Sequence, residues 1–152
     1  LAMWVNYANP GKNLTLSIAK VLKTKNSSII FLQNHGIIVG ADDANEVLKI
    51  HEEINKKIIE KLNLKPKFEK QIIQKNQILL SQNKVIFPDQ VVYLSHDNSI
   101  KSTAGDEMFE VFNYLINQIN KLNFEPNFIS AENVEYIKNM ESEKYRKSLK
   151  IC

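Results

Sequence analysis

The first 62 residues carry a pattern of apolar and polar positions that predicts a helix, two strands and a second helix. After the Pro10-Gly11 turn signal, apolar residues recur at helical spacing and predict a short amphipathic helix over residues 12–24. The apolar residues of this helix are Leu14, Ile18, Val21 and Leu22. Residues 28–32 and 37–39 are rich in Ile, Val and Phe at consecutive positions, which is typical of strands covered on both faces. The pattern therefore predicts a sheet with helices on both sides.

The second helix is predicted over residues 43–62. The pair Asp42-Asp43 supplies an N-cap and places negative charge at the start of this helix. One helical face is then traced by Val47, His51, Ile54, Ile58 and Leu62. We therefore expect His51 on the inward face as a hydrogen-bonded, partly buried histidine, and we favour this interpretation over a ligand role.

The middle of the chain is predicted to contain another helix and a strand. Pro66 ends the second helix, and residues 68–80 carry a pattern compatible with a further helix. Residues 84–87 are expected to be extended, and the Val-Val-Tyr-Leu sequence of residues 91–94 has the composition of a strand. A turn follows this strand, so that we expect His96 to be an exposed loop histidine.

Two more helices are predicted towards the end of the chain. Asp106 can start the first, whose apolar face is a methionine and aromatic stripe of the kind that usually belongs to a core. That face comprises Met108, Phe112, Leu115, Ile119 and Leu122. Residues 123–127 form a predicted loop, and Ser130 is a good N-cap for a last helix that becomes charged towards Arg146.

The composition is that of a soluble globular protein. A chain of 152 residues suits one domain with a core, and 43% of the residues are hydrophobic while 24% are charged. No apolar run approaches the ~20 residues that cross a bilayer, and the opening residues lack the pattern of a secretory signal, so we expect none there. The lone Cys152 cannot form an internal disulfide, which fits a reducing compartment. We therefore expect a cytoplasmic protein with no membrane partner.

The charge pattern and the glycine content argue against other functional classes. The net charge of +3 is spread along the chain without a dense basic block, so that no nucleic acid partner is expected. The basic isoelectric point of 8.9 keeps nucleic-acid binding only as the weakest alternative. With four glycines, neither a dinucleotide-binding fingerprint nor a Walker A motif can be assembled.

One histidine stands at a position that suits ligand binding. Residues 31–40 read Phe-Leu-Gln-Asn-His-Gly-Ile-Ile-Val-Gly, in which an apolar run breaks at Asn-His-Gly and then resumes. This pattern indicates two short strands joined at a turn that carries His35. An imidazole at a strand end, beside a residue without a side chain, has a nitrogen free to meet a metal or a substrate. The alternative interpretation is a solvated turn histidine.

Several segments together resemble the class II aldolase/adducin family. The resemblance is carried by Tyr-Ala-Asn-Pro-Gly-Lys-Asn-Leu at residues 7–14, the helix after it, residues 30–40 and the helix of residues 44–62. The segments at residues 87–94 and 139–146 are similar to the C-terminal extension of longer, sugar-type members. The fold class that this resemblance implies is α/β, a three-layer α/β/α arrangement with a largely antiparallel sheet that is incomplete in this chain.

The resemblance also implies a division of the chain into two regions. Residues 1–64 correspond to the C-terminal part of an aldolase/adducin-like domain. Residues 65–152 correspond to the C-terminal extension, with a strand and helices that pack on the same domain.

The resemblance gives His35 a chemical role. In the family, the Asn-His-Gly histidine is the third histidine ligand of a catalytic divalent metal, so His35 is implied as a ligand of Zn²⁺ or another divalent metal. The implied reaction is that of a lyase or epimerase acting on a sugar or sugar phosphate through a metal-stabilised enediolate.

The resemblance also implies that the protein forms a homo-oligomer. Family members are typically homotetramers in which C-terminal residues reach towards a neighbour's site. The candidates for that role are Tyr136, Tyr145 and Arg146, with Tyr145 as the candidate acid or base, although packing and solubility are the favoured explanation for all three.

This sequence departs from the family pattern in one respect. The family has a His-x-His pair and an acid/base Glu upstream of the turn, whereas this sequence holds His35, His51 and His96 without any His-x-His. One histidine cannot hold a catalytic zinc, so we expect the 152 residues alone to be inactive. Two hypotheses remain, of which we favour the C-terminal portion of a larger aldolase-like enzyme over a non-catalytic, adducin-like interaction or oligomerisation module.

Overall fold

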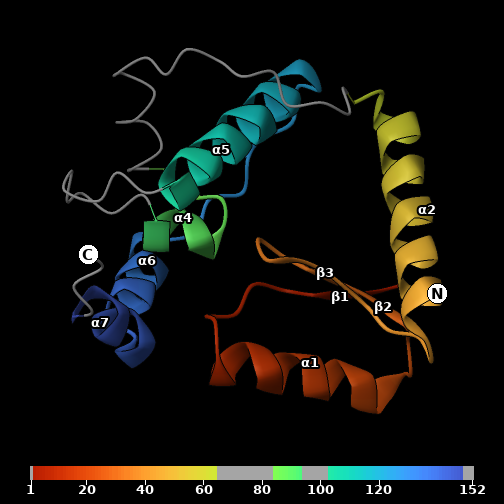
Figure 1. Cartoon of the computed structure of the whole chain (residues 1–152), viewed down its shortest axis with the longest axis horizontal. Coiled ribbons are helices and arrows are strands. Elements are labelled where there is room, and N and C mark those ends of the chain that lie inside the picture. Colours follow the sequence, from red (N-terminus) through yellow and green to blue (C-terminus); the bar gives the residue numbers. More distant parts are fainter. Residues whose placement is uncertain (1, 65–83, 94–102, 149–152) are drawn as a thin grey trace. The chain divides into compact units, whose positions relative to one another are not determined.

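The computed structural model describes residues 2–64, 84–93 and 103–148, and it has mixed α/β architecture with a small sheet and six helices in these ranges (Figure 1). The chain divides into two compact units, Leu1–Lys67 and Phe68–Cys152. The predicted helix at residues 68–80 and the predicted turn at His96 lie outside the described residues.

The first unit is built on a three-stranded sheet in the order β1-β2-β3. Strand β1 (Met3–Val5) runs parallel to β2 (Ile29–Leu32), and β2 runs antiparallel to β3 (Gly36–Val39). Helix α1 (Lys12–Thr24) supplies the crossover that a parallel pair requires. The helix and both predicted strands are confirmed, whereas β1 was not predicted.

The core of the first unit lies between the sheet and α1. Val5, Ile30 and Leu32 are buried, and the partly buried residues packed against them are Leu14, Ile18 and Val21. These three helix residues stand at the predicted apolar positions, while Leu22 is 39% exposed. Helix α1 thus covers one face of the sheet, and the helix of residues Ala44–Leu62 contacts β3. Trp4, which alternates with the buried Val5 along β1, is 58% exposed on the other face.

Helix α2 (Ala44–Leu62) follows β3 and has well-formed caps at both ends. The carboxylate of Asp43 accepts hydrogen bonds from the backbone N–H groups of Asn45 and Glu46, at 2.8 and 3.1 Å, which confirms the predicted N-cap. At the other end, Asn63 adopts a left-handed conformation with φ 48°.

The inward face of α2 differs from the predicted one. The half-buried side chains are those of Val47, Ile50, Ile54, Ile59 and Leu62, whereas His51 is exposed. Ile50 thus takes the place expected for His51, because its position three residues after Val47 and four before Ile54 completes a helical face. The expectation that His51 is partly buried is wrong.

The second unit, where the structure describes it, is helical. Its helices are α4 (Pro88–Tyr93), α5 (Thr103–Lys121), α6 (Ala131–Lys138) and α7 (Glu141–Ser148). Its buried apolar residues are Val85, Val91, Phe109, Phe112, Ile129 and Ile137. No helix in the described ranges combines the length and the apolar content that crossing a bilayer requires.

The strand predicted at residues 91–94 is wrong, because Val91 to Tyr93 belong to helix α4. Pro88 occupies the first helical position, which its fixed φ suits. The side chain of Gln90, only 1% exposed, accepts a hydrogen bond from the Ile86 N–H at 2.9 Å and donates one to the Lys84 carbonyl at 3.1 Å. Helix α4 also packs against α5 and α6, and these tertiary contacts override the strand propensity of the Val-Val-Tyr sequence.

The predicted last helix is in fact two helices. Ser130 caps α6 as expected, since its hydroxyl accepts from the Asn133 N–H at 3.3 Å. The helix then ends at Asn139, whose side-chain amide donates to the carbonyl of Glu135 at 2.8 Å. This bond satisfies a carbonyl at the helix end, and a new helix begins at Glu141.

Candidate functional site

The turn between β2 and β3 carries His35 at the end of the sheet. The His35 N–H donates to the carbonyl of Leu32 at 3.0 Å, which closes a four-residue turn. Asn34, the third residue of this turn, has φ 64°, and Gly36 follows with φ 118°. Asparagine tolerates the first conformation and glycine the second, so the backbone explains both residues. The backbone geometry does not require a histidine between them.

The imidazole of His35 is half-buried and held on two sides. Its Nε2 lies 2.8 Å from the carbonyl oxygen of Ala8, and its ring stacks on Tyr7 with centroids 5.5 Å apart and planes 16° from parallel. Since a carbonyl oxygen can only accept, Nε2 carries the proton of this hydrogen bond. In the neutral ring, Nδ1 then bears the lone pair, and no described residue bonds to it.

Contacts between residues 5–9 and residues 33–35 hold this arrangement, and we call them the turn clasp. The Gln33 N–H donates to the carbonyl of Val5 at 3.0 Å, which continues the bonding between β1 and β2 beyond the strand ends. The Gln33 Oε1 accepts from the Tyr7 N–H at 2.9 Å. The Tyr7 hydroxyl lies 3.1 Å from the Asn9 Oδ1, and burial raises the pKa of Tyr7 above its ordinary value.

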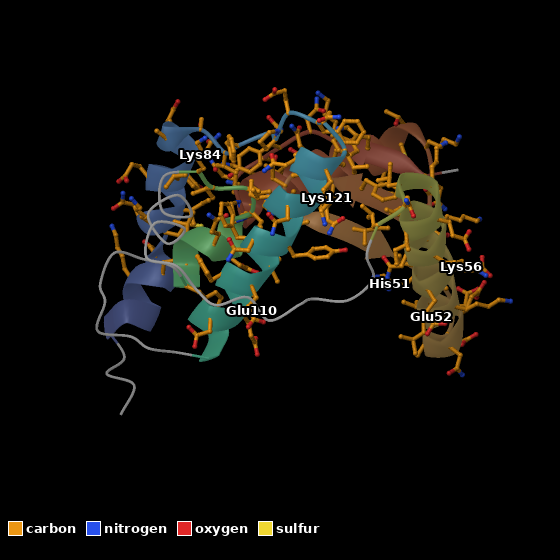
Figure 2. All side chains as sticks on the ribbon, turned by 90° about the horizontal axis from the view of Figure 1, so that it is seen from above. His51, Glu52, Lys56, Lys84, Glu110 and Lys121 are labelled. Atoms are coloured by element: carbon orange, nitrogen blue, oxygen red, sulfur yellow. The ribbon has the colours of Figure 1, made fainter. Side chains whose placement is uncertain are left out.

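The described residues provide one donor of the kind a metal site needs at this turn. A catalytic zinc takes about three protein ligands, and no group of three or more His, Cys, Asp or Glu in the described ranges is placed to hold a metal. His51 lies elsewhere, exposed on α2, with its Nδ1 3.2 Å from the Asn55 side-chain amide (Figure 2). The donor set of the described residues therefore does not make a complete metal site.

The candidates near the C-terminus, Tyr136, Tyr145 and Arg146, belong to the second unit. Tyr136 is 45% exposed on α6. The side chains of Tyr145 and Arg146 lie outside the described ones, so the prediction for Tyr145 stays a prediction.

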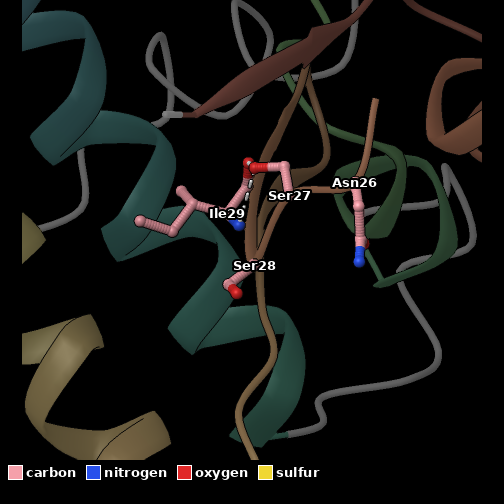
Figure 3. Close-up of a pocket in the computed structure, with 4 residues that line it drawn as sticks. All are labelled: Asn26, Ser27, Ser28 and Ile29. Atoms are coloured by element: carbon pink, nitrogen blue, oxygen red, sulfur yellow. Dashed lines mark hydrogen bonds between the residues drawn. The ribbon is translucent and has the colours of Figure 1, made fainter. Parts of the chain in front are cut away.

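A separate hollow of about 230 Å³ lies in the loop before β2 and is lined by Asn26, Ser27, Ser28 and Ile29 (Figure 3). The Ser27 hydroxyl donates to the carbonyl of Ile29 at 2.9 Å and accepts from its N–H at 3.2 Å. This loop precedes β2, whereas the turn with His35 follows it, so that the hollow and the imidazole lie at opposite ends of the strand. The hollow is not part of the His35 site.

Sequence reasoning identified His35 but not the residues that hold it. Tyr7 belongs to a segment used for the family resemblance, yet its stacking partner is 28 positions away along the chain. Gln33 directly precedes the Asn-His-Gly segment, and nothing in the sequence showed that its side chain bonds to the backbone of Tyr7. If the sequence had predicted a β1 strand parallel to β2, we would have expected residues 5–9 and residues 33–35 to lie side by side.

No model of a known protein family matches the chain, and no curated protein and no solved structure shows significant similarity to it.

Proposed function

We propose that this chain is the C-terminal part of a divalent-metal-dependent, class II aldolase-like lyase or epimerase acting on a sugar or sugar phosphate. In this proposal, the three-stranded sheet is a portion of a larger three-layer α/β/α domain in a cytoplasmic homotetramer. His35 contributes one ligand to Zn²⁺ or another divalent metal, and a His-x-His pair and an acid/base Glu come from sequence upstream.

The observation that supports the proposal most is the setting of the His35 imidazole. Histidines that bind metals almost always donate their other ring N–H to a carboxylate, a backbone carbonyl or water, which fixes the tautomer. His35 has this arrangement, because its Nε2–H points at the Ala8 carbonyl at 2.8 Å. The backbone conformation of the turn accounts for Asn34 and Gly36, but the histidine has no such explanation.

The chemistry of the proposed class follows from the metal. When bound, a divalent cation supplies a Lewis acid that polarises the carbonyl and hydroxyl oxygens of the substrate. The contribution of this chain is to orient one donor, because the hydrogen bond to Ala8 and the stacked ring of Tyr7 hold the His35 imidazole. Aldol cleavage and epimerisation both pass through an enolate, so the proposal covers both reactions.

Formation of the enolate gives a test that does not depend on the particular sugar. The full-length protein, with its upstream region, is incubated in D₂O with short ketose phosphates, and exchange of the proton beside the carbonyl is followed by NMR. We expect exchange that a chelator abolishes and that His35→Ala removes. A full-length protein whose upstream region lacks a His-x-His pair and a nearby Glu would contradict the proposal.

A second candidate function is a non-catalytic interaction or oligomerisation module with the same fold. The observation that favours it is the turn clasp, in which His35 joins residues 5–9 to the turn and so has a structural use without any metal. The two functions differ in metal content, because the module needs none.

A further inference from the structure

The turn clasp restricts the orientation and the tautomer of the His35 imidazole. Three hydrogen bonds join residues 5–9 to residues 33–35, namely Gln33 N–H to the Val5 carbonyl, Tyr7 N–H to the Gln33 side chain, and His35 Nε2–H to the Ala8 carbonyl. The Tyr7 ring lies against one face of the imidazole at 5.5 Å. The ring is thus held by one bond and by one flat contact.

We infer that the turn clasp fixes His35 in the Nε2–H tautomer and leaves Nδ1 as the nitrogen that takes a ligand, with Tyr7 and Gln33 as positioning residues. The carbonyl of Ala8 can only accept a hydrogen bond, which places the proton on Nε2. A neutral imidazole carries one proton, so Nδ1 keeps its lone pair. This inference rests on the proposed function only for the identity of the ligand.

Gln33 acts on His35 through the backbone of residues 7 and 8. Its Oε1 accepts from the Tyr7 N–H at 2.9 Å, which fixes the position of the residue immediately before Ala8. Tyr7 in turn limits rotation of the imidazole through the stacked ring, with planes 16° from parallel. Each residue therefore affects the ring without itself donating to it.

The tautomer can be read directly by NMR, without any metal. Long-range ¹H–¹⁵N correlation spectra of the chain, labelled on histidine and recorded at alkaline pH, distinguish Nε2–H from Nδ1–H rings. We expect His35 to show the Nε2–H pattern and a ring proton that exchanges slowly with solvent. The exposed His51 serves as an internal control with fast exchange. An Nδ1–H pattern for His35, or exchange as fast as that of His51, would overturn the inference.

Matched variants test the positioning residues. Tyr7→Leu removes the stacked ring, while Tyr7→Phe keeps it, so the slow exchange of the Nε2–H should be lost in the first and retained in the second. Gln33→Leu removes the acceptor for the Tyr7 N–H, whereas Gln33→Glu keeps one. The slow exchange of the Nε2–H should therefore be lost in Gln33→Leu and retained in Gln33→Glu. Far-ultraviolet circular dichroism checks that each variant folds. Unchanged exchange in both folded leucine variants would show that neither residue positions the ring.

A metal titration separates this inference from the proposed function. With Zn²⁺ added to the full-length protein, we expect the ¹⁵N signal of His35 Nδ1 to move, while Nε2 keeps its proton. Binding through Nε2 would overturn the inference and leave the proposed function standing. A correct tautomer with no response to Zn²⁺ would leave the tautomer assignment standing and count against both the proposed function and Nδ1 as a metal ligand.

Discussion

The turn around His35 contains backbone conformations that only certain residue types adopt without strain. Gly36 has φ 118°, a conformation that side-chain-bearing residues rarely adopt, although a Cβ at this position would meet no atom within 4 Å. The constraint is therefore conformational and not steric crowding by neighbours. Gly40, at the end of β3, also has open space around it, but its φ lies outside the left-handed region.

This contrast predicts different effects of two alanine substitutions. Gly36→Ala should lower the free energy of unfolding by about 1–3 kcal/mol, because it forces alanine into a strained conformation. Gly40→Ala, the matched control, should leave it unchanged or raise it by up to about 1 kcal/mol by restricting the unfolded chain. Urea unfolding followed by circular dichroism measures both. Equal effects of the two substitutions would contradict the account of the turn.

The raised pKa of Tyr7 leads us to expect that stability depends on pH. Burial raises the pKa of Tyr7 in the folded protein, so the unfolded chain releases this phenolic proton at a lower pH than the folded chain does. The unfolded state therefore binds fewer protons above about pH 10, and stability falls as pH rises through that range.

The test compares the protein with Tyr7→Phe, which cannot ionise and retains the ring against His35. The free energy of unfolding of the variant should fall less steeply between about pH 9.5 and pH 11, the range around the ordinary tyrosine pKa. Other tyrosines and lysines contribute equally to both proteins and cancel in the difference. Parallel pH profiles would show that Tyr7 is not buried as described.

Among the elements, helices α1 and α2 were predicted well because their signals are local. Apolar residues at helical spacing gave α1, and the cap at Asp43 gave the start of α2. Strand β1 is three residues long and gains its pairing from β2, which lies more than 20 positions later, so no local pattern showed it. The helical state of α4 likewise depends on packing against α5 and α6, which lie later in the chain. Sequence pattern predicts such elements poorly because distant contacts decide them.

The same reasoning applies to the candidate site. The position of His35 at a turn between two strands could be predicted from the break in the apolar run and is confirmed. Its contacts with Tyr7 and Ala8 could not, because they depend on the parallel pairing of β1 with β2. The face of α2 was misjudged at His51 because several helical stripes fit the same run of apolar residues.

The cap of α2 gives a prediction at the scale of an element. Asp43→Ala removes the acceptor of two hydrogen bonds, at 2.8 and 3.1 Å, and the negative charge at the helix start. We expect a loss of about 1 kcal/mol in the free energy of unfolding. Asp42→Ala is the matched control, since it removes an equal charge one residue earlier without a capping bond and should cost less than about 0.5 kcal/mol. Thermal unfolding of the two variants side by side decides between a cap and a charge effect.

The chain as a whole divides into two compact units, and the three-stranded sheet of the first unit carries the His35 imidazole. The first unit, Leu1–Lys67, contains both sides of the turn clasp, residues 5–9 and residues 33–35. In the proposed enzyme, the remaining ligands come from the upstream sequence. The central claim is therefore that His35 is one ligand in a shared metal site.

Metal content of the full-length protein tests this claim most directly. The measurement is the amount of zinc per chain, by elemental analysis after removal of free metal, in the protein, in His35→Ala and in His51→Ala. We predict about one zinc per chain in the protein and in His51→Ala, and loss of most of it in His35→Ala, since one of about three ligands is removed. Equal zinc content in the protein and in His35→Ala would contradict the account, as would a full-length protein that holds no divalent metal.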